Sequence, residues 1–275
     1  MIPSVALNTG HSIPQIGLGT WPLDDAEIAR VIPIAAELGY RHIDTATAYG
    51  NEAGVGEGIR RTGIDRSEFF VTTKLDLRFQ GDDKAIAGLT AALERMKLDY
   101  VDLVLLHWPA PWEDKFVSTW KTFELLYARG LSRSIGVSNF KPAHLERLAE
   151  ETGTVPAVNQ IQLHPRITRV EQRAYDSARG IVTESYSPLG GQSDRFLATP
   201  LLAEIGARHG KTPGQVVLRW HVQNGLVPLP KSANPVRLAE NIDVFDFELT
   251  DTDLADLSSL DGGPGAGVDS DQFGH

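Results

Sequence analysis

The sequence predicts a single α/β domain, residues 1–275, folded as a (β/α)8 barrel with an N-terminal β-hairpin. Eight short apolar runs alternate with amphipathic stretches, and strands that alternate with helices pair in parallel through crossover connections. Eight such units in 275 residues match the length of one barrel. A doubly wound sheet would place a G-x-G-x-x-G loop after its first strand, which Gly17 and Gly19 do not complete because position 22 is proline.

Each predicted strand is a short run of apolar and β-branched residues. In order, the runs are 16–19, 41–44, 69–74, 101–107, 134–139, 157–160, 181–185 and 226–230. The helical windows between them place apolar residues at helical spacing and include 26–38, 84–96, 120–129, 143–151 and 213–223. Asp24 is a candidate N-cap of the first window, and Asn51 is a candidate N-cap of the helix that follows Gly50.

The two ends of the chain differ from this repeating pattern. Residues 4–15 predict a hairpin that turns at Asn8, Thr9 and Gly10 and covers the closed end of the barrel. The segment 261–275 is rich in glycine and acidic residues and is therefore expected to be a loop. Two interpretations stay open for this loop, a frayed terminus and a flap over an active site.

Composition excludes several classes of protein. The net charge of −10 argues against general nucleic-acid binding, so an anionic ligand would need a local basic pocket. The absence of cysteine excludes disulfides and thiolate metal sites. No window approaches the roughly 20 apolar residues of a membrane span. The first 20 residues lack a basic start and a long apolar run, which predicts a cytoplasmic protein without a cleaved signal peptide.

Polar side chains end nearly every predicted strand. In a (β/α)8 barrel the C-terminal strand ends carry the catalytic groups, so these residues are expected to meet at one rim. Any one of them could be a helix cap or a solvated strand end, but chance would scatter them over both rims. The set comprises Asp44, Lys74, His107, Ser138, Asn139, Asn159, Gln160, Glu184, Ser185, Tyr186, Lys231 and Ser232, with Tyr49 in the loop beyond the second strand.

Four of these residues can form a general acid with its tuning partners. A tyrosine has an ordinary pKa of about 10, and a neighbouring ammonium lowers that pKa by stabilising the phenolate. Lys74 can supply the charge for Tyr49, and Asp44 can hold Lys74 in place. His107 can hydrogen-bond a substrate oxygen and orient it beside the phenol. The chain carries no nucleophile elbow, no H-E-x-x-H motif and no P-loop.

An ordered set of motifs covers nearly the whole chain. The set is IGLGTW (16–21), GYRHIDTATAYGNEAGVGEGIR (39–60), FVTTKL (70–75), LDYVDLVLLHWP (98–109), SIGVSNF (134–140), AVNQIQLHP (157–165), YSPLG (186–190) and PLPKSANPVRLAENIDVFDFELT (228–250). In these residues the sequence resembles the aldo-keto reductases, and specifically the bacterial branch that includes 2,5-diketo-gluconate reductases.

The resemblance implies NADPH-dependent reduction of aldehydes or ketones to alcohols, without a metal. It implies that Tyr49 is the proton donor, that Lys74 and Asp44 tune it, and that His107 orients the carbonyl. It implies carboxamide contacts from Ser138, Asn139 and Gln160, stacking by Tyr186, and ribose-side contacts from Thr20 and Asp44. The other implied cofactor contacts are Ser187 and Leu189 after the seventh strand, Lys231, Ser232 and Arg237 at the 2′-phosphate, and Glu240 and Asn241 at the adenine.

The 2′-phosphate contact also has independent support in the sequence. In an acidic chain, Lys231 and Arg237 lie six residues apart around a predicted helix start, and Ser232 adds a hydroxyl. Such a site favours NADPH over NADH, although a solvated basic pair is the alternative explanation.

Departures from the family pattern concern mostly the substrate. Many relatives have Trp at the position of Tyr186, some have Asn at the position of Ala233, and animal members have a longer C-terminal loop. Trp21, Trp108 and Trp112 lie just beyond the first and fourth strands and can form an apolar wall for a small carbonyl substrate, with Tyr49 and His107 at its polar end. Trp120 and Trp220 fall within helical windows and are expected in the core. A monomer is expected from relatives of this type.

Two other functions remain as alternatives. Some members of the superfamily are non-catalytic, so a regulatory barrel protein that binds NADPH is one alternative. A barrel hydrolase would need two rim carboxylates about 5 to 10 Å apart. Asp44 and Glu184 are the candidates, but Asp44 has Lys74 available as a partner, and Glu184 is expected to point away from the barrel interior.

Overall fold

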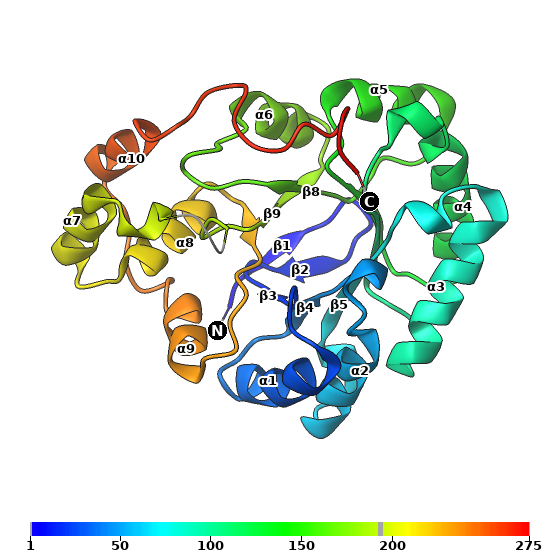
Figure 1. Cartoon of the computed structure of the whole chain (residues 1–275), viewed down its shortest axis with the longest axis horizontal. Coiled ribbons are helices and arrows are strands. Elements are labelled where there is room, and N and C mark those ends of the chain that lie inside the picture. The colour runs from blue at the N-terminus through cyan, green and yellow to red at the C-terminus, as the bar shows by residue number, and fades with distance from the viewer. Residues whose placement is uncertain (1, 192–194, 275) are drawn as a thin grey trace.

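A computed structural model describes residues 2–191 and 195–274 and shows a closed ring of parallel strands surrounded by helices (Figure 1). The strands are, in chain order, β3 (Leu18–Gly19), β4 (His42–Asp44), β5 (Phe70–Leu75), β6 (Leu103–Leu106), β7 (Ile135–Ser138), β8 (Val158–Gln162), β9 (Val182–Tyr186) and β10 (Val227–Pro228). Each pairs in parallel with the next. All eight overlap the predicted strand runs, which confirms the predicted barrel.

Backbone hydrogen bonds close the ring between its first and last strands. The amide of Gly17 donates to the carbonyl of Pro228 at 3.1 Å, and the amide of Gly19 donates to the carbonyl of Pro230 at 3.1 Å. A Cβ at position 17 would lie 2.6 Å from Nδ1 of His42. Glycine is therefore required at position 17, because the imidazole of the neighbouring strand passes close to the backbone there.

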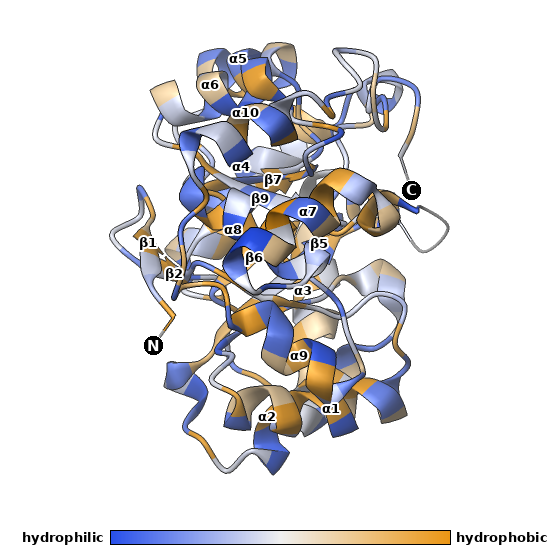
Figure 2. Cartoon of the chain, turned by 90° about the vertical axis from the view of Figure 1, so that its left-hand side faces the viewer, coloured by the Kyte–Doolittle hydropathy of each residue, from blue (hydrophilic) through white to orange (hydrophobic). Residues whose placement is uncertain are grey.

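Helices cover the outside of the barrel (Figure 2). They are α1 (Asp25–Glu37), α2 (Glu52–Arg61), α3 (Asp82–Met96), α4 (Phe116–Ala128), α5 (Pro142–Glu151), α6 (Val170–Ala178), α7 (Pro200–His209), α8 (Pro213–Gln223), α9 (Pro235–Ile242) and α10 (Asp251–Ser258). Short 3-10 turns are η1 (Thr47–Tyr49), η2 (Arg66–Glu68), η3 (Leu77–Phe79), η4 (Pro111–Glu113) and η5 (Phe196–Ala198). Within the described ranges, no helix is long and apolar enough to cross a membrane.

The two predicted helix caps have different outcomes. Asp24 caps α1, because its carboxylate accepts a hydrogen bond from the amide of Glu27 at 2.8 Å. Asn51 occupies the N-cap position of α2, but the prediction that its side chain caps the helix is wrong. Its amide instead donates to the carbonyls of Thr20 and Leu23. The buried amide satisfies these loop carbonyls, which water cannot reach.

The N-terminal hairpin covers one end of the barrel, as predicted. Strands β1 (Ser4–Ala6) and β2 (Ser12–Pro14) pair antiparallel. Leu7 and Ile13 pack against apolar residues at this end of the barrel, including Phe70, Leu103 and Val158. We call the hairpin end the lower end and the opposite end, where the strands have their C-termini, the upper end. Figure 2 shows the hairpin at one end of the barrel and the C-terminal segment at the other. Apolar side chains thus fill the lower end, and the site lies in the upper half.

Strand alternation places polar residues in the upper interior. Ile43 and Val71 pack outward among apolar residues of the surrounding helices. Asp44, one residue after Ile43 on β4, and Lys74, three residues after Val71 on β5, are buried and paired inside the barrel. The two-residue period of a strand therefore fixes which side chains reach the interior.

Candidate active site

Lys74 lies at the centre of the polar upper interior. Its Nζ donates to Oδ1 of Asp44 at 2.6 Å, to the carbonyl of Thr45 at 3.0 Å and to the hydroxyl of Tyr49 at 3.4 Å. Lys74 and Asp44 are both nearly inaccessible, at 1% and 4% exposure. The structure thus brings the three predicted residues from β4, η1 and β5 together, with the ammonium between carboxylate and phenol.

Opposing electrostatic effects act on this group. Burial lowers the pKa of Lys74, but Asp44 and Tyr49 outweigh burial and hold that pKa above its ordinary value. Burial raises the pKa of Tyr49, and the charge of Lys74 acts in the opposite direction. The net pKa of Tyr49 lies above its ordinary value in the protein alone. Lys74 therefore limits the rise without reversing it.

Aromatic side chains surround the Tyr49 phenol. The ring centroid of Tyr49 lies 6.1 Å from that of His107 and 6.4 Å from that of Trp21. Trp21 is 56% exposed, whereas His107 is buried. Trp108 is also buried and stacks on His107. The predicted proton donor, carbonyl-orienting histidine and two tryptophans thus form one aromatic cluster.

The residues predicted to hold the carboxamide and to stack on the nicotinamide form a second hydrogen-bonded group, on β7 and the residue after it, β8 and β9. The amide nitrogen of Asn139 donates to the carbonyl of His107 and to Oγ of Ser138. The hydroxyl of Tyr186 donates to Oδ1 of Asn139 at 2.9 Å. The amide of Gln160 reaches across the barrel and donates to Oδ2 of Asp44 at 2.9 Å. Oε1 of Gln160 accepts no hydrogen bond from the described residues, so it remains available as an acceptor.

The prediction that Glu184 points away from the interior is wrong. Its side chain is fully buried and Oε2 accepts from Nε2 of Gln160 at 3.0 Å, while Oε1 lies 3.6 Å from Nε2 of His42. β10 and β3 lie between β9 and β4 in the closed ring, so the side chains of β4 and β9 meet only across the interior. The physical reason is the strand period, since Glu184 lies two residues before Tyr186, whose hydroxyl reaches Asn139.

His42 is a site residue that the sequence analysis missed. It lies two residues before Asp44 on the same strand, so the two-residue period could have identified it. Its Nε2 lies 3.2 Å from the hydroxyl of Thr72, which is likewise two residues before Lys74. Burial lowers the pKa of His42 to about 3, so the imidazole is neutral near pH 7. His42, Thr72 and Glu184 form a polar layer directly below Asp44 and Lys74.

The remaining predicted cofactor residues surround the junction between β3 and β10 or follow β9. Thr20 is fully buried, and its hydroxyl has no hydrogen-bond partner among the described residues. Lys231 and Arg237 are exposed, and neither forms an ion pair within ranges 2–191 and 195–274. The other members are the buried Ser232 and Asn241 and the half-buried Ser187, Leu189 and Glu240.

These observations fit a bound dinucleotide phosphate. A buried hydroxyl without a partner is costly unless a ligand pairs with it, and Thr20 lies beside Asp44, whose carbonyl accepts from the Thr20 amide. At the other end, Asn234 accepts from the first amides of α9, so binding of an anion there depends on the side chains of Lys231, Ser232 and Arg237. Both ends of the predicted cofactor site thus offer groups for a ligand.

The C-terminal segment folds back over the barrel and is not frayed. Phe273 packs edge-on against Trp108 with ring centroids 5.1 Å apart. Lys141 binds Asp269 at 2.5 Å and Asp271 at 2.6 Å, and His144 lies 2.9 Å from Asp271. The predicted loop is described as far as residue 274, and its last residue lies outside the described residues. These contacts favour the interpretation of the segment as a flap beside the site.

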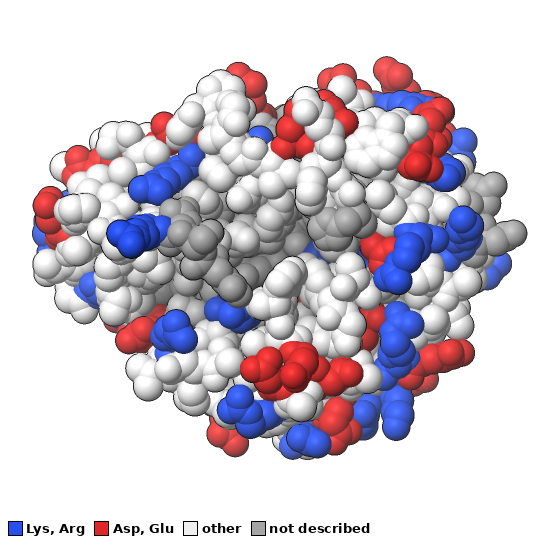
Figure 3. Space-filling view, in the orientation of Figure 1, with Lys and Arg blue, Asp and Glu red and all other residues white. Residues whose placement is uncertain are grey.

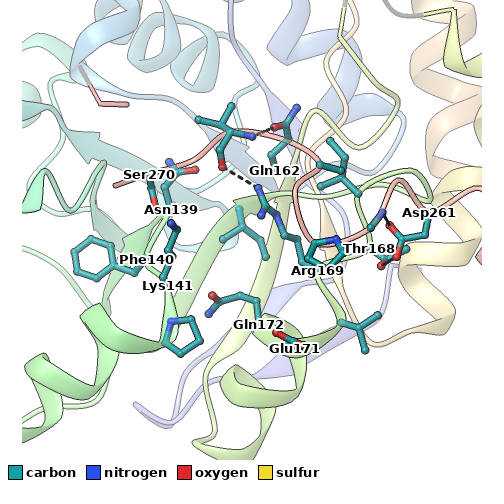
Figure 4. Close-up of a pocket in the computed structure, with 18 residues that line it drawn as sticks. Asn139, Phe140, Lys141, Gln162, Thr168, Arg169, Glu171, Gln172, Asp261 and Ser270 are labelled. Carbon is teal, nitrogen blue, oxygen red and sulfur yellow. Dashed lines mark hydrogen bonds between the residues drawn. The ribbon is translucent and has the colours of Figure 1, made fainter. Parts of the chain in front are cut away.

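A cavity of about 290 Å³ lies beneath this segment (Figure 4). Arg169 crosses it and donates to the carbonyl of Val268, and Thr168 donates to Asp261. Among its lining residues, Asn139 alone belongs to the predicted cofactor set. The cavity therefore lies beside the site around Tyr49.

On the face shown in Figure 3, acidic and basic side chains gather mainly around the periphery.

Trp120 and Trp220 are 0% and 4% exposed, which confirms their predicted core positions. Trp112 is 51% exposed, and its ring lies beside Gly274 of the C-terminal segment, where a Cβ would come within 3.2 Å of it.

The fold and the site define a class: a (β/α)8 barrel with a tyrosine, lysine, aspartate and histidine at the C-terminal ends of its strands. The model of the aldo/keto reductase family matches residues 15–261. The chain belongs to the aldo/keto reductase family and is an oxidoreductase.

Three similar proteins illustrate this membership. An aldo-keto reductase of Mycolicibacterium smegmatis is 49% identical over 273 residues, covering 99% of this chain and 98% of that protein. The methylglyoxal reductase DkgA of Escherichia coli is 43% identical over 271 residues, covering 98% of both chains. The crystal structure of an Asp-to-Ala variant of Gox0644 in complex with NADPH has a TM-score of 0.94 at 41% identity, covering 100% of this chain and 99% of that one.

Proposed function

We propose that the protein reduces small aldehydes or ketones to alcohols with NADPH, and that Tyr49 donates the proton. The observation that carries this proposal is the position of Lys74 between Asp44 and Tyr49, 2.6 Å from the carboxylate and 3.4 Å from the phenol. NADPH in the Gox0644 structure and NADP in the structure of a Bombyx mori aldo-keto reductase support the cofactor. The similarity to methylglyoxal reductases supports small carbonyl compounds, α-dicarbonyls among them.

The residues of this chain then have distinct roles. Bound NADPH supplies a hydride to the carbonyl carbon. Tyr49 gives its hydroxyl proton to the carbonyl oxygen as negative charge develops there, and the charge of Lys74 stabilises the phenolate that remains. Asp44 keeps Lys74 charged and in place. His107 binds the carbonyl oxygen and orients it toward the phenol, and solvent returns the proton to Tyr49.

The cofactor residues would hold NADPH along the β3–β10 junction. Ser138, Asn139 and Gln160 would bind the carboxamide and Tyr186 would stack on the nicotinamide. Thr20 and Asp44 would contact the ribose side, and Ser187 and Leu189 would line the middle of the site. Lys231, Ser232 and Arg237 would bind the 2′-phosphate, with Glu240 and Asn241 at the adenine.

The hydrolase alternative needs two carboxylates that a substrate can reach. Glu184 does point inward, but it and Asp44 do not form such a pair. Both oxygens of Asp44 already bind protein groups, Lys74 and Gln160, and Glu184 is fully buried below them. A substrate cannot contact both carboxylates. No observation favours the non-catalytic regulatory alternative. The cytoplasmic location, the monomeric state and the lack of nucleic-acid binding stay predictions.

The test is Tyr49→Phe, assayed by loss of NADPH absorbance with methylglyoxal and a panel of small aldehydes and keto-sugars. We expect turnover to fall by roughly 100- to 10,000-fold, the usual contribution of a general acid. The dissociation constant for NADPH, measured by fluorescence titration, should stay within a factor of about two, because the substitution removes one hydroxyl that is not among the proposed cofactor contacts.

The matched control is Tyr127→Phe, because Tyr127 lies on the outer helix α4 and is 40% exposed. This variant should keep full turnover. A Tyr49→Phe enzyme with near-normal turnover would contradict the assigned proton donor, and a wild type without turnover across the panel would contradict the proposed reaction.

A further inference from the structure

Glu184 is a buried carboxyl group that the proposed mechanism does not use. It lies inside the barrel below the catalytic pair, and one amide nitrogen links it to that pair. Nε2 of Gln160 donates to Oε2 of Glu184 at 3.0 Å and to Oδ2 of Asp44 at 2.9 Å. Two carboxyl groups from different strands therefore accept from the two N–H groups of one amide.

The charges around the Gln160 amide favour a proton on one of the two carboxyl groups. Among the described residues, Lys74 is the one cation that contacts Asp44. His42 lies 3.6 Å from Glu184 and is neutral, because burial lowers its pKa to about 3. If both carboxyl groups were ionised, the fully buried interior would hold an uncompensated negative charge. Burial, reinforced by the charge of Asp44, raises the pKa of Glu184 to about 8.

The neighbours of Glu184 on every adjoining element agree with a neutral acid. Across the interior it faces β4 and β5, and the paired strands β8 and β10 lie beside it, of which β10 contributes only the apolar Val227 and Pro228. The titratable and polar groups concerned are His42, Asp44, Thr72, Lys74, Gln160 and Tyr49, with Tyr186 on its own strand. Lys74 is the only cation in this set, and it already contacts Asp44.

We propose that Glu184 is a positioning residue that must carry a proton for carbonyl reduction, because the neutral acid leaves the Gln160 amide on Asp44 and the charge of Lys74 on Tyr49. The inference rests on the proposed function. An ionised Glu184 would accept more strongly from its own N–H of Gln160 and draw the amide away from Asp44. Its charge would also raise the pKa of Tyr49 and make the phenol a poorer proton donor.

The first experiment compares pH profiles of kcat/KM for wild type and Glu184→Gln. Glutamine keeps the shape of the side chain and cannot ionise. We expect the alkaline limb of the wild-type profile, near the Glu184 pKa of about 8, to move up by about one pH unit or more in Glu184→Gln. The same alkaline limb in both enzymes, or an equal loss of activity at every pH, would overturn the proposal.

Ser185→Ala is the matched control for this comparison. Ser185 is the next residue on β9, is equally buried, and points to the other side of the strand. Its hydroxyl has no hydrogen-bond partner among the described residues, so removing it should leave the alkaline limb where it is in the wild type. A control that shifts like Glu184→Gln would show that any change on β9 has this effect, which overturns the specific role of Glu184.

The second experiment needs no turnover and uses the wild type. The infrared band of a protonated carboxylic acid should be present at about pH 6.5 and disappear by about pH 9.5, on either side of the Glu184 pKa. Asp176→Asn provides the background, because burial raises the pKa of buried Asp176 to about 6. Absence of the band at pH 6.5 in that background would overturn the proposal even if Glu184→Gln does not fold.

The two readouts also separate this inference from the proposed reaction. A carbonyl panel without turnover contradicts the proposed function, whereas the infrared titration still reports on Glu184. A band with turnover but no shift of the alkaline limb contradicts only the positioning role.

Discussion

Nζ of Lys74 lies 2.6 Å from Oδ1 of Asp44 in the interior of the barrel, where neither side chain contacts bulk water. The pair connects β4 to β5 and directs one positive charge at the phenol of Tyr49. Breaking a buried ion pair by removing one partner typically costs about 3–5 kcal/mol, because the other charge stays buried. This relationship makes stability and turnover separable by experiment.

Lys74→Met should lower both the turnover and the stability of the protein. Turnover should fall by at least about 100-fold, because Tyr49 loses the charge that stabilises its phenolate. The free energy of unfolding in urea should fall by about 3–5 kcal/mol, because Asp44 is left unpaired. The double variant Asp44→Asn, Lys74→Met should recover most of that stability and none of the turnover. Recovery of turnover in the double variant would contradict the role of the charge.

Arg237→Ala should weaken NADPH binding and leave NADH binding unchanged. Loss of one charge-assisted hydrogen bond is worth about 1.5–3 kcal/mol, so the NADPH dissociation constant should rise by roughly 10- to 150-fold. Fluorescence titration with both cofactors measures the difference. Lys121→Ala removes an exposed cation from α4, on the outer wall, and should change neither constant. An unchanged NADPH constant in Arg237→Ala would rule out the assigned phosphate contact.

Lys141→Met should loosen the C-terminal segment. Lys141 holds Asp269 and Asp271, so its removal leaves two carboxylates close together without a lysine partner. Hydrogen exchange of residues 264–274 should become faster in the variant, and high salt should produce part of the same change in the wild type. Lys121→Met serves as the control. Equal exchange in all three proteins would show that the Lys141 ion pairs do not hold the segment, which its other contacts, such as Phe273 with Trp108 and His144 with Asp271, would then hold.

Asp253→Asn should destabilise the protein at neutral pH and much less in acid. Asp253 is buried, and hydrogen bonds from His209, Arg208 and Thr250 hold its pKa below the ordinary value despite burial. A depressed pKa contributes stability above the unfolded-state pKa of about 3.9, and this contribution disappears as the pH falls through the folded-state pKa. The difference between wild type and variant in urea midpoint should therefore be largest near pH 7 and shrink below about pH 4. A constant difference would contradict this linkage.

Much of the fold could be predicted from local sequence patterns. Each of the eight strands is a short apolar run between helical windows, and the hairpin turns at Asn8 to Gly10 as its composition indicates. The cap at Asp24 was also predicted, because the side chain needs only the amide three residues later. Such features depend on neighbours in sequence, and these neighbours are visible in the chain itself.

The errors concern partners that are distant in sequence. Asn51 binds the carbonyls of Thr20 and Leu23, 31 and 28 residues away, so its position before a helix gave the wrong partner. Glu184 meets His42 across the ring, a contact that no local pattern describes. Applying the strand period to His42, Asp44 and Glu184 would have placed all three inside. The distances around Lys74 depend on the ring closing, which no single strand determines.

The two ends of the barrel differ in what their side chains do, because the hairpin covers an apolar end and the charged groups lie at the other. Leu7, Ile13 and Phe70 belong to a dry apolar cluster at one end, and the charged groups occupy the other. Packing can thus be tuned near the hairpin while the electrostatics around Tyr49 are left alone, and the chemistry can be altered without disturbing that cluster. One half of the same eight strands therefore contributes mainly to stability, and the other half carries the residues proposed for catalysis.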